Sequence, residues 1–176
     1  MTTVVPYNII PLNILFKGIF DFDELYKKVY DWLTFRGFQL HETKFKKKAK
    51  EFGLEIEVNW EAWMKLNEMV KNWYSLHFHI WDASYIETVV NGEKKKLMKA
   101  RIFLRLERKV DFDYGGTYDE SKLKKMLRKF LVQVVYKMYF DAFWEDKLRF
   151  KLYELSNVVK ETLDMQIKGN ESWDVW

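Results

Sequence analysis

Two histidines, His77 and His79, are the side chains whose type and spacing most directly suggest chemistry in this chain. They alternate with Leu76, Phe78 and Ile80, and this period of two is typical of a β-strand that buries one of its faces. Both imidazoles are therefore expected on the polar face of the strand. An imidazole can bind a transition metal or transfer a proton near neutral pH, and a neighbouring carboxylate assists either task.

Two flanking segments, 54–66 and 98–109, show the same alternation and predict the neighbouring strands. Keeping the apolar faces in register across the hairpins predicts three rows on the polar face: Trp63–His77–Glu107, Glu61–His79–Arg105 and Asn59–Trp81–Phe103. Two imidazoles and two carboxylates could bind zinc or iron, or one His–Glu pair could act as a general base. One interpretation is therefore a metal-dependent enzyme that uses His77, His79, Glu61 and Glu107. The isolated His41 is expected to be structural.

Large aromatic side chains share this polar face with the histidines. Soluble proteins usually expose such apolar patches where they bind a partner. The favoured interpretation is a non-catalytic interaction module that self-associates, or binds another protein, through this face or through the distal part of the C-terminal helix. The predicted contact residues are Trp63, Trp73, His77, His79, Trp81, Phe103 and Arg105. An alternative is a platform for single-stranded nucleic acid, on which aromatic rings stack on bases while lysines follow the phosphates.

Although the net charge is only +4, basic residues are concentrated in three runs, at 44–50, 93–101 and 122–129. Such runs usually form solvated faces, and this interpretation is favoured over a nucleic-acid or anionic-membrane surface. In the first run, the expected hairpin register places Lys46 opposite Glu57 and Lys48 opposite Glu55. Part of the basic charge is therefore expected to be neutralised within the sheet.

Composition and missing motifs exclude several classes of protein. The 14 Phe, 10 Tyr and 8 Trp among 176 residues supply too much apolar surface for a disordered chain, and the absence of Cys excludes a disulfide scaffold. No phosphate-binding loop, dinucleotide-binding turn, nucleophile elbow or metalloprotease motif is present, so no cofactor is expected. No uncharged apolar run reaches the ~18 residues that cross a bilayer, and the first residues lack the basic region of a signal peptide. We expect a soluble, cytoplasmic protein.

The remaining pattern predicts one α+β domain over residues 1–168, followed by a polar tail at 169–176. An apolar strand at 12–20 leads to Asp21 or Asp23, either of which can cap a helix that ends at Gly37. A four-stranded antiparallel meander follows. Its turns are expected at 50–53, 67–72 and 91–94, the last of which contains the hairpin signal Asn91-Gly92.

A helical period returns after residue 116 and continues to about residue 166. A step in its apolar stripe near residue 145 predicts that this long C-terminal helix bends or splits there, and it is expected to pack on the sheet. Segment 127–144 is apolar on nearly all sides, which favours a central core helix. The alternative is a helix on a membrane surface, with Tyr139, Phe143 and Trp144 at the level of the lipid headgroups.

Two resemblances add to this interpretation. The order of strand, helix, meander and long helix is similar to the helix-grip folds of the START and Bet v 1 type, which implies a curved antiparallel sheet around a C-terminal helix and a small-molecule or lipid ligand. The block DFDELYKKVYDWLTFRGF at 21–38 resembles a group of small uncharacterised archaeal α+β proteins. That resemblance covers about the first two-thirds of the chain and implies no known activity.

Overall fold

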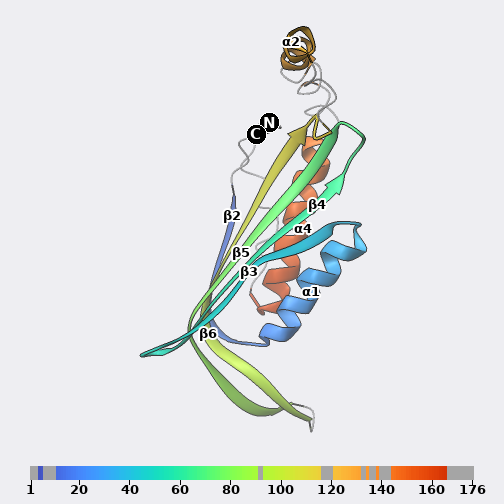
Figure 1. Ribbon diagram of the computed structural model, residues 1–176. Helices are drawn as coiled ribbons and strands as arrows, with labels where there is room; N and C mark the ends of the chain where they lie inside the picture. The colour runs from blue at the N-terminus through green and yellow to red at the C-terminus, as the bar shows by residue number, and fades with distance from the viewer. Residues whose placement is uncertain are drawn as a thin grey trace.

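The computed structural model describes residues 4–5, 11–90, 93–115, 121–131, 134, 138 and 144–165. Its elements are β1 (Val4–Val5), β2 (Leu12–Phe20), α1 (Phe22–Phe35), β3 (Gln39–Lys50), β4 (Gly53–Lys65), β5 (Val70–Val90), β6 (Glu93–Phe112), α2 (Lys122–Phe130) and α4 (Glu145–Thr162). The predicted α+β class, with an antiparallel sheet and helices, is confirmed (Figure 1). The predicted tail at 169–176 lies outside the residues described.

All six strands belong to one sheet. Its order is β1-β6-β5-β4-β3, and β2 also pairs with β6. The meander therefore runs from β3 to β6, and the N-terminal strands lie end to end along the outer side of β6: β2 pairs with residues 98–106, and β1 pairs with Val110 and Asp111. Strand β3 forms the opposite edge. The sheet thus has two strands more than the predicted four-stranded meander.

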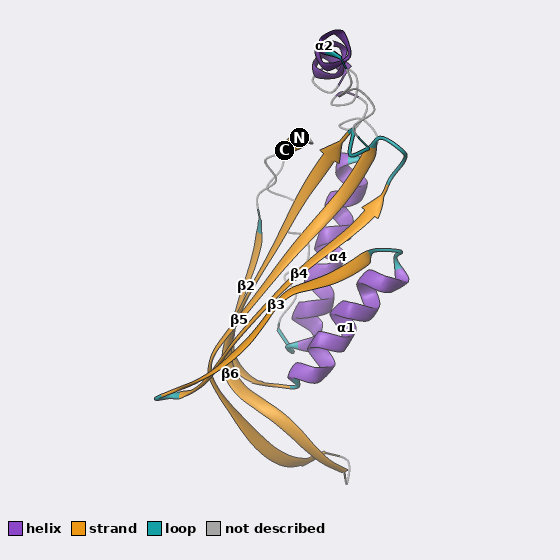
Figure 2. Cartoon of the chain, in the orientation of Figure 1, coloured by secondary structure: helices purple, strands orange, loops and turns teal. Residues whose placement is uncertain are grey.

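Helices α1 and α4 lie side by side on one face of the sheet (Figure 2). The Asp21 carboxylate accepts a hydrogen bond from the Glu24 N–H at 3.0 Å and caps α1, as its sequence predicts. The helical spacing then turns four apolar side chains towards the sheet, and these are Leu25, Val29, Trp32 and Leu33. Helix α4 buries Leu148, Leu152, Leu155 and Val159 in the same way.

Helix α2 does not pack on the sheet. It lies beyond the end of the sheet (Figure 1), and the side chains of Leu127 and Phe130 are 48% and 57% exposed. The C-terminal helix was predicted to be long, bent or split near residue 145, and packed on the sheet; of the described residues, α4 packs there. The prediction of a core helix at 127–144 is wrong for the part of that segment that is described. The physical reason is space, because α1 and α4 together already cover the apolar face of the sheet. The predicted membrane contacts Tyr139 and Phe143 lie outside the described residues.

A β-bulge changes the faces of the long β5–β6 hairpin. The register shifts between Trp81 and Ser84, and Asp82 has a positive φ of 55°. Ala83 is consequently turned onto the helix-covered face, where it is 2% exposed, although simple alternation places it on the other face. The β3–β4 turn packs here as well: Gly53 has a φ of 132°, and a Cβ at this position would lie 2.9 Å from the carbonyl oxygen of Ala83. Only glycine fits this turn without strain.

Within the described residues, no helix is long and apolar enough to cross a membrane.

Candidate interaction face

The candidate site is the face of the sheet opposite α1 and α4, which we call the open face. Strand alternation places all seven predicted contact residues on it, and no described helix covers it (Figure 1). Six of them are half-buried, namely Trp63, Trp73, His77, His79, Trp81 and Phe103, whereas Arg105 is exposed. The rings shield one another on a sheet face that keeps contact with solvent.

The rows across this face differ from the predicted ones. His77 lies between Asn59 and Arg105, and His79 lies between Glu57 and Phe103. Glu61 and Glu107, the two carboxylates expected beside the histidines, instead flank Ser75. Trp63 lies opposite Trp73. The face assignment of these residues is as expected, but the register between neighbouring strands is not.

The misplaced register has its origin in the β4–β5 turn. This turn was expected between Asn67 and Asn72, but Val70 is already in the strand and Asn72 is fully buried. The Asn67 side chain accepts hydrogen bonds from the backbone N–H groups of Met69 and Val70, both at 2.8 Å, and closes the turn early. The sequence does contain a signal for this early turn. Val70 continues the period of two that places Tyr74 and the later apolar residues of β5 on one face.

The β5–β6 hairpin has a second, smaller displacement. Val90 pairs with Glu93, so the chain turns at the expected position, although Asn91-Gly92 itself lies outside the described residues. Closer to the histidines, the bulge between Trp81 and Ser84 shifts the pairing of β5 with β6 further. By contrast, β3 and β4 pair as predicted, with Lys46 opposite Glu57 and Lys48 opposite Glu55.

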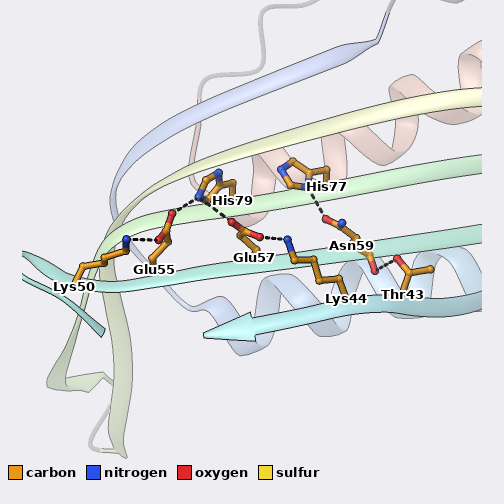
Figure 3. Close-up of polar contacts among 8 residues, drawn as sticks. All are labelled: Thr43, Lys44, Lys50, Glu55, Glu57, Asn59, His77 and His79. Atoms are coloured by element: carbon orange, nitrogen blue, oxygen red, sulfur yellow. Dashed lines mark hydrogen bonds and ion pairs between the residues drawn. The ribbon is translucent and has the colours of Figure 1, made fainter. Parts of the chain in front are cut away.

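His79 forms a small polar cluster with two glutamates that sequence reasoning did not place beside it (Figure 3). Its Nε2 atom lies 2.9 Å from Glu55 Oε1 and 4.0 Å from Glu57 Oε1. Lys44 pairs with Glu57, and the Lys50 ammonium lies 3.5 Å from Glu55. The hydrogen bond from His79 lowers the pKa of Glu55, and the one from Lys44 lowers the pKa of Glu57, since each favours the ionised carboxylate.

This cluster is the one group of three potential metal ligands in the described part of the chain. One atom each from Glu55, Glu57 and His79 lies within 4.8 Å of the others, and this donor set suits zinc or iron. Both carboxylates are already neutralised, however, so a cation would have to displace Lys44 and Lys50. The ligand set predicted from the sequence is not assembled around one point, because Glu61 and Glu107 lie beside His77 rather than His79.

His77 borders a shallow hollow of about 430 Å³ in the open face. The short side chain of Ser75 lies between Glu61 and Glu107, and its size leaves this space. The hollow is lined by Thr43, Asn59, Trp60, Glu61, Ser75, Leu76, His77, Arg105 and Glu107. His77 Nδ1 hydrogen-bonds the side-chain oxygen of Asn59 (Figure 3). Burial lowers the pKa of His77 below its ordinary value of 6.5, and the neighbouring His79 lowers it further.

The lowered pKa of His77 predicts a pH dependence of stability. The folded state disfavours the charged imidazole, so the free energy of unfolding should fall as the pH drops below about 6.5 and towards the folded-state pKa. Thermal melts of the native protein and of His77→Gln between pH 5 and 8 should therefore converge at acidic pH. The control is Gln39→Ala, an exposed and non-titratable position on the edge strand β3, whose difference from the native protein should not change with pH. Parallel curves for all three proteins would contradict the prediction.

Aromatic contacts continue to both sides of the histidines. The rings of Trp63 and Trp73 lie 6.1 Å apart, and the Lys71 ammonium lies 4.1 Å from the Trp63 ring. On the other side, the ring of His79 lies 4.0 Å from that of Trp81. The open face therefore presents flat side chains along β5, with an interruption at Ser75 between Trp73 and His77.

Leu15 extends this surface onto β2 and was not among the predicted contact residues. It lies opposite Phe103, so one row crosses four strands from Glu57 through His79 and Phe103 to Leu15. Leu15 is 68% exposed. The outer face of segment 12–20 carries two apolar residues, Leu15 and Ile19, beside Asn13 and Lys17, and these two residues are a sequence signal for a partly apolar outer face.

Several cations of the open face are paired with acids of the same face. Besides the pairs made by Lys44 and Lys50, Arg105 pairs with Glu107, and the Lys109 ammonium lies 3.7 Å from Glu61. Arg101 pairs with Asp82 at 2.6 Å. The face is thus aromatic, and much of its charge is neutralised locally.

No protein-family model matches the chain, and no curated protein matches it either.

Proposed function

We propose that this protein is a non-catalytic binding module that docks a protein surface, most simply a second copy of itself, on its open face. The observation that carries the proposal is the row of half-buried aromatic and imidazole rings on β4, β5 and β6 that no described helix covers. Soluble domains expose an apolar patch of this kind chiefly where a partner covers it. Aromatic side chains with few free charges are also typical of the centre of protein interfaces.

Local neutralisation of charge favours a protein partner over single-stranded nucleic acid. A phosphate-tracking surface needs cations that can exchange small counterions for phosphates. Here Lys44, Arg105 and Lys109 each already contact a glutamate. A polyanion would have to break these pairs, whereas a protein surface can cover them intact.

The other two interpretations find less support. A helix-grip ligand domain needs a space between its C-terminal helix and the sheet, but Leu152, Leu155 and Val159 of α4 are buried in the sheet core. An enzyme based on His77 and His79 needs a carboxylate that is free to act, and the two beside His79 are each held by a lysine. The hollow beside His77 is open and has both polar and apolar lining residues, and it suits a side chain of a docked partner.

The proposal predicts that Leu15→Lys weakens self-association at least about tenfold, because two ammonium groups would be buried in a symmetric interface. Leu15 is exposed, so the fold should tolerate the change. The matched control is Phe35→Lys, since Phe35 is 89% exposed at the end of α1, on the other side of the sheet. Sedimentation velocity from ~1 to ~100 µM measures the effect. A native protein that stays monomeric at ~100 µM, or a Leu15→Lys variant that associates normally, would contradict the proposal.

A further inference from the structure

Helix α2 has an apolar stripe that the described part of the chain leaves uncovered. The stripe consists of Leu123, Met126, Leu127 and Phe130, whose spacing places them on one side of a helix. Their exposed fractions are 78%, 75%, 48% and 57%, and Val134 and Met138 further along are 48% and 70% exposed. A surface helix of a globular protein normally turns such a stripe towards the core. This one lies beyond the end of the sheet (Figure 1).

The rest of the helix is strongly basic. Its nine residues, KLKKMLRKF, contain no acid and five cations, which are Lys122, Lys124, Lys125, Arg128 and Lys129. No acidic residue occurs between Ser121 and Phe140 in the sequence. An apolar stripe combined with a cationic remainder is the composition of helices that lie in the interface of an anionic membrane.

The same composition argues against a second copy of α2 or a nucleic acid as the binding partner of the apolar stripe. A second copy of α2 would bring five further cations to the contact, and like charges at close range repel. A nucleic acid would pair with the cations but would leave the leucines and the phenylalanine in water. An anionic lipid surface can bind both the cations and the apolar stripe, because its headgroups attract the lysines and its acyl chains accept the stripe.

We propose that α2 is a peripheral anchor that binds anionic lipid bilayers. A nine-residue helix is about 14 Å long, so it lies along the membrane surface rather than crossing it. Leu123, Met126 and Phe130 enter the boundary between headgroups and acyl chains. The basic side chains stay at the level of the headgroups. This inference does not depend on the open face, which lies on a different part of the molecule.

The experiment is co-sedimentation of the full chain with large vesicles of phosphatidylcholine, with or without about a quarter of phosphatidylglycerol. We expect at least about tenfold stronger binding to the anionic vesicles, and this preference should weaken as salt rises. The variant Leu123→Gln with Leu127→Gln should lose at least about tenfold in binding. Its matched control is Phe35→Gln with Phe52→Gln, which removes two other exposed apolar side chains and should bind normally.

A second pair of variants tests the charges. Lys122→Gln with Lys124→Gln should lose about tenfold in binding to anionic vesicles and little in binding to neutral ones. Lys27→Gln with Lys48→Gln, which removes two exposed lysines elsewhere, should leave binding unchanged. Equal binding to both vesicle types overturns the proposal, as does an equal loss in a control. The proposal is also overturned if the Leu123/Leu127 variant loses self-association but still binds vesicles. It is overturned as well if the protein binds a single-stranded oligonucleotide and does not bind vesicles.

Discussion

Replacing Glu145 by Ala is expected to lower the free energy of unfolding by about 3 kcal/mol, because it removes the carboxylate that compensates a buried guanidinium. Arg108 is 4% exposed. Its guanidinium pairs with the Glu145 carboxylate, and Nη1 lies 3.3 Å from the Glu145 backbone oxygen. Burial lowers the pKa of Arg108, and the negative charge of Glu145 opposes that shift by favouring the charged form. The pair thus connects the start of α4 to β6.

Asp146 provides the matched control for this prediction. It is the next residue, it also belongs to the first turn of α4, and it pairs with Arg149 at the surface, where its side chain is 71% exposed. Asp146→Ala should cost less than about 1 kcal/mol. Urea denaturation at neutral pH, followed by circular dichroism, measures both variants. Equal losses for the two acids would show that the helix terminus, rather than the buried pair, sets the effect.

Replacing Trp60 by Ala is expected to cost about 3–5 kcal/mol, since it opens a large cavity at the centre of the core. Trp60 is 1% exposed. The rings of Tyr26 and Phe78 meet it edge-on at 4.5 and 5.4 Å between centroids. Its indole N–H donates to the Glu42 carboxylate at 3.1 Å, so the substitution also removes a hydrogen bond.

The comparison for this variant is Trp63→Ala, on the same strand. Trp63 faces the opposite side of β4, where it stays half-buried, so its removal should cost clearly less stability and should instead weaken association. Urea denaturation and sedimentation together separate the two effects. If Trp63→Ala destabilised the chain as much as Trp60→Ala, the open face would be part of the core rather than a docking surface.

Much of the fold follows from local signals that are visible in the sequence. Asp21 caps α1, and the helical spacing of Leu25 and Leu33 identifies its buried side. The β3–β4 register also follows, because the turn before Gly53 leaves a single way to pair the apolar faces. The exposed α2 could not be predicted in this way. An apolar period shows that a helix needs a covered side but does not show which element covers it, and here α1 and α4 occupy the sheet.

The candidate site was only partly predictable for a different reason. Alternation along a strand assigns a face, so His77, His79 and Trp73 could be placed on one surface without any knowledge of the fold. Which side chains meet across strands depends on where each turn closes. The turn set by Asn67 replaced Glu61 by Glu57 as the β4 neighbour of His79, and the bulge at Asp82 helped to replace Arg105 by Phe103 as its β6 neighbour. The alternation of Val70 with Tyr74 indicates the early turn, whereas no feature of the sequence pattern reveals the bulge.

The lysines of β3 have a consequence for the kind of assembly that the protein can form. This strand ends the sheet on one side, and an edge of this length is a template on which further strands could add without limit. Lys46, Lys47, Lys48 and Lys50 are all exposed along it, and an incoming copy of the same edge would bring the same charges. Growth of an open-ended fibre is thereby disfavoured. The self-association that we propose would instead use the flat of the sheet, where a two-fold axis closes the assembly after two copies.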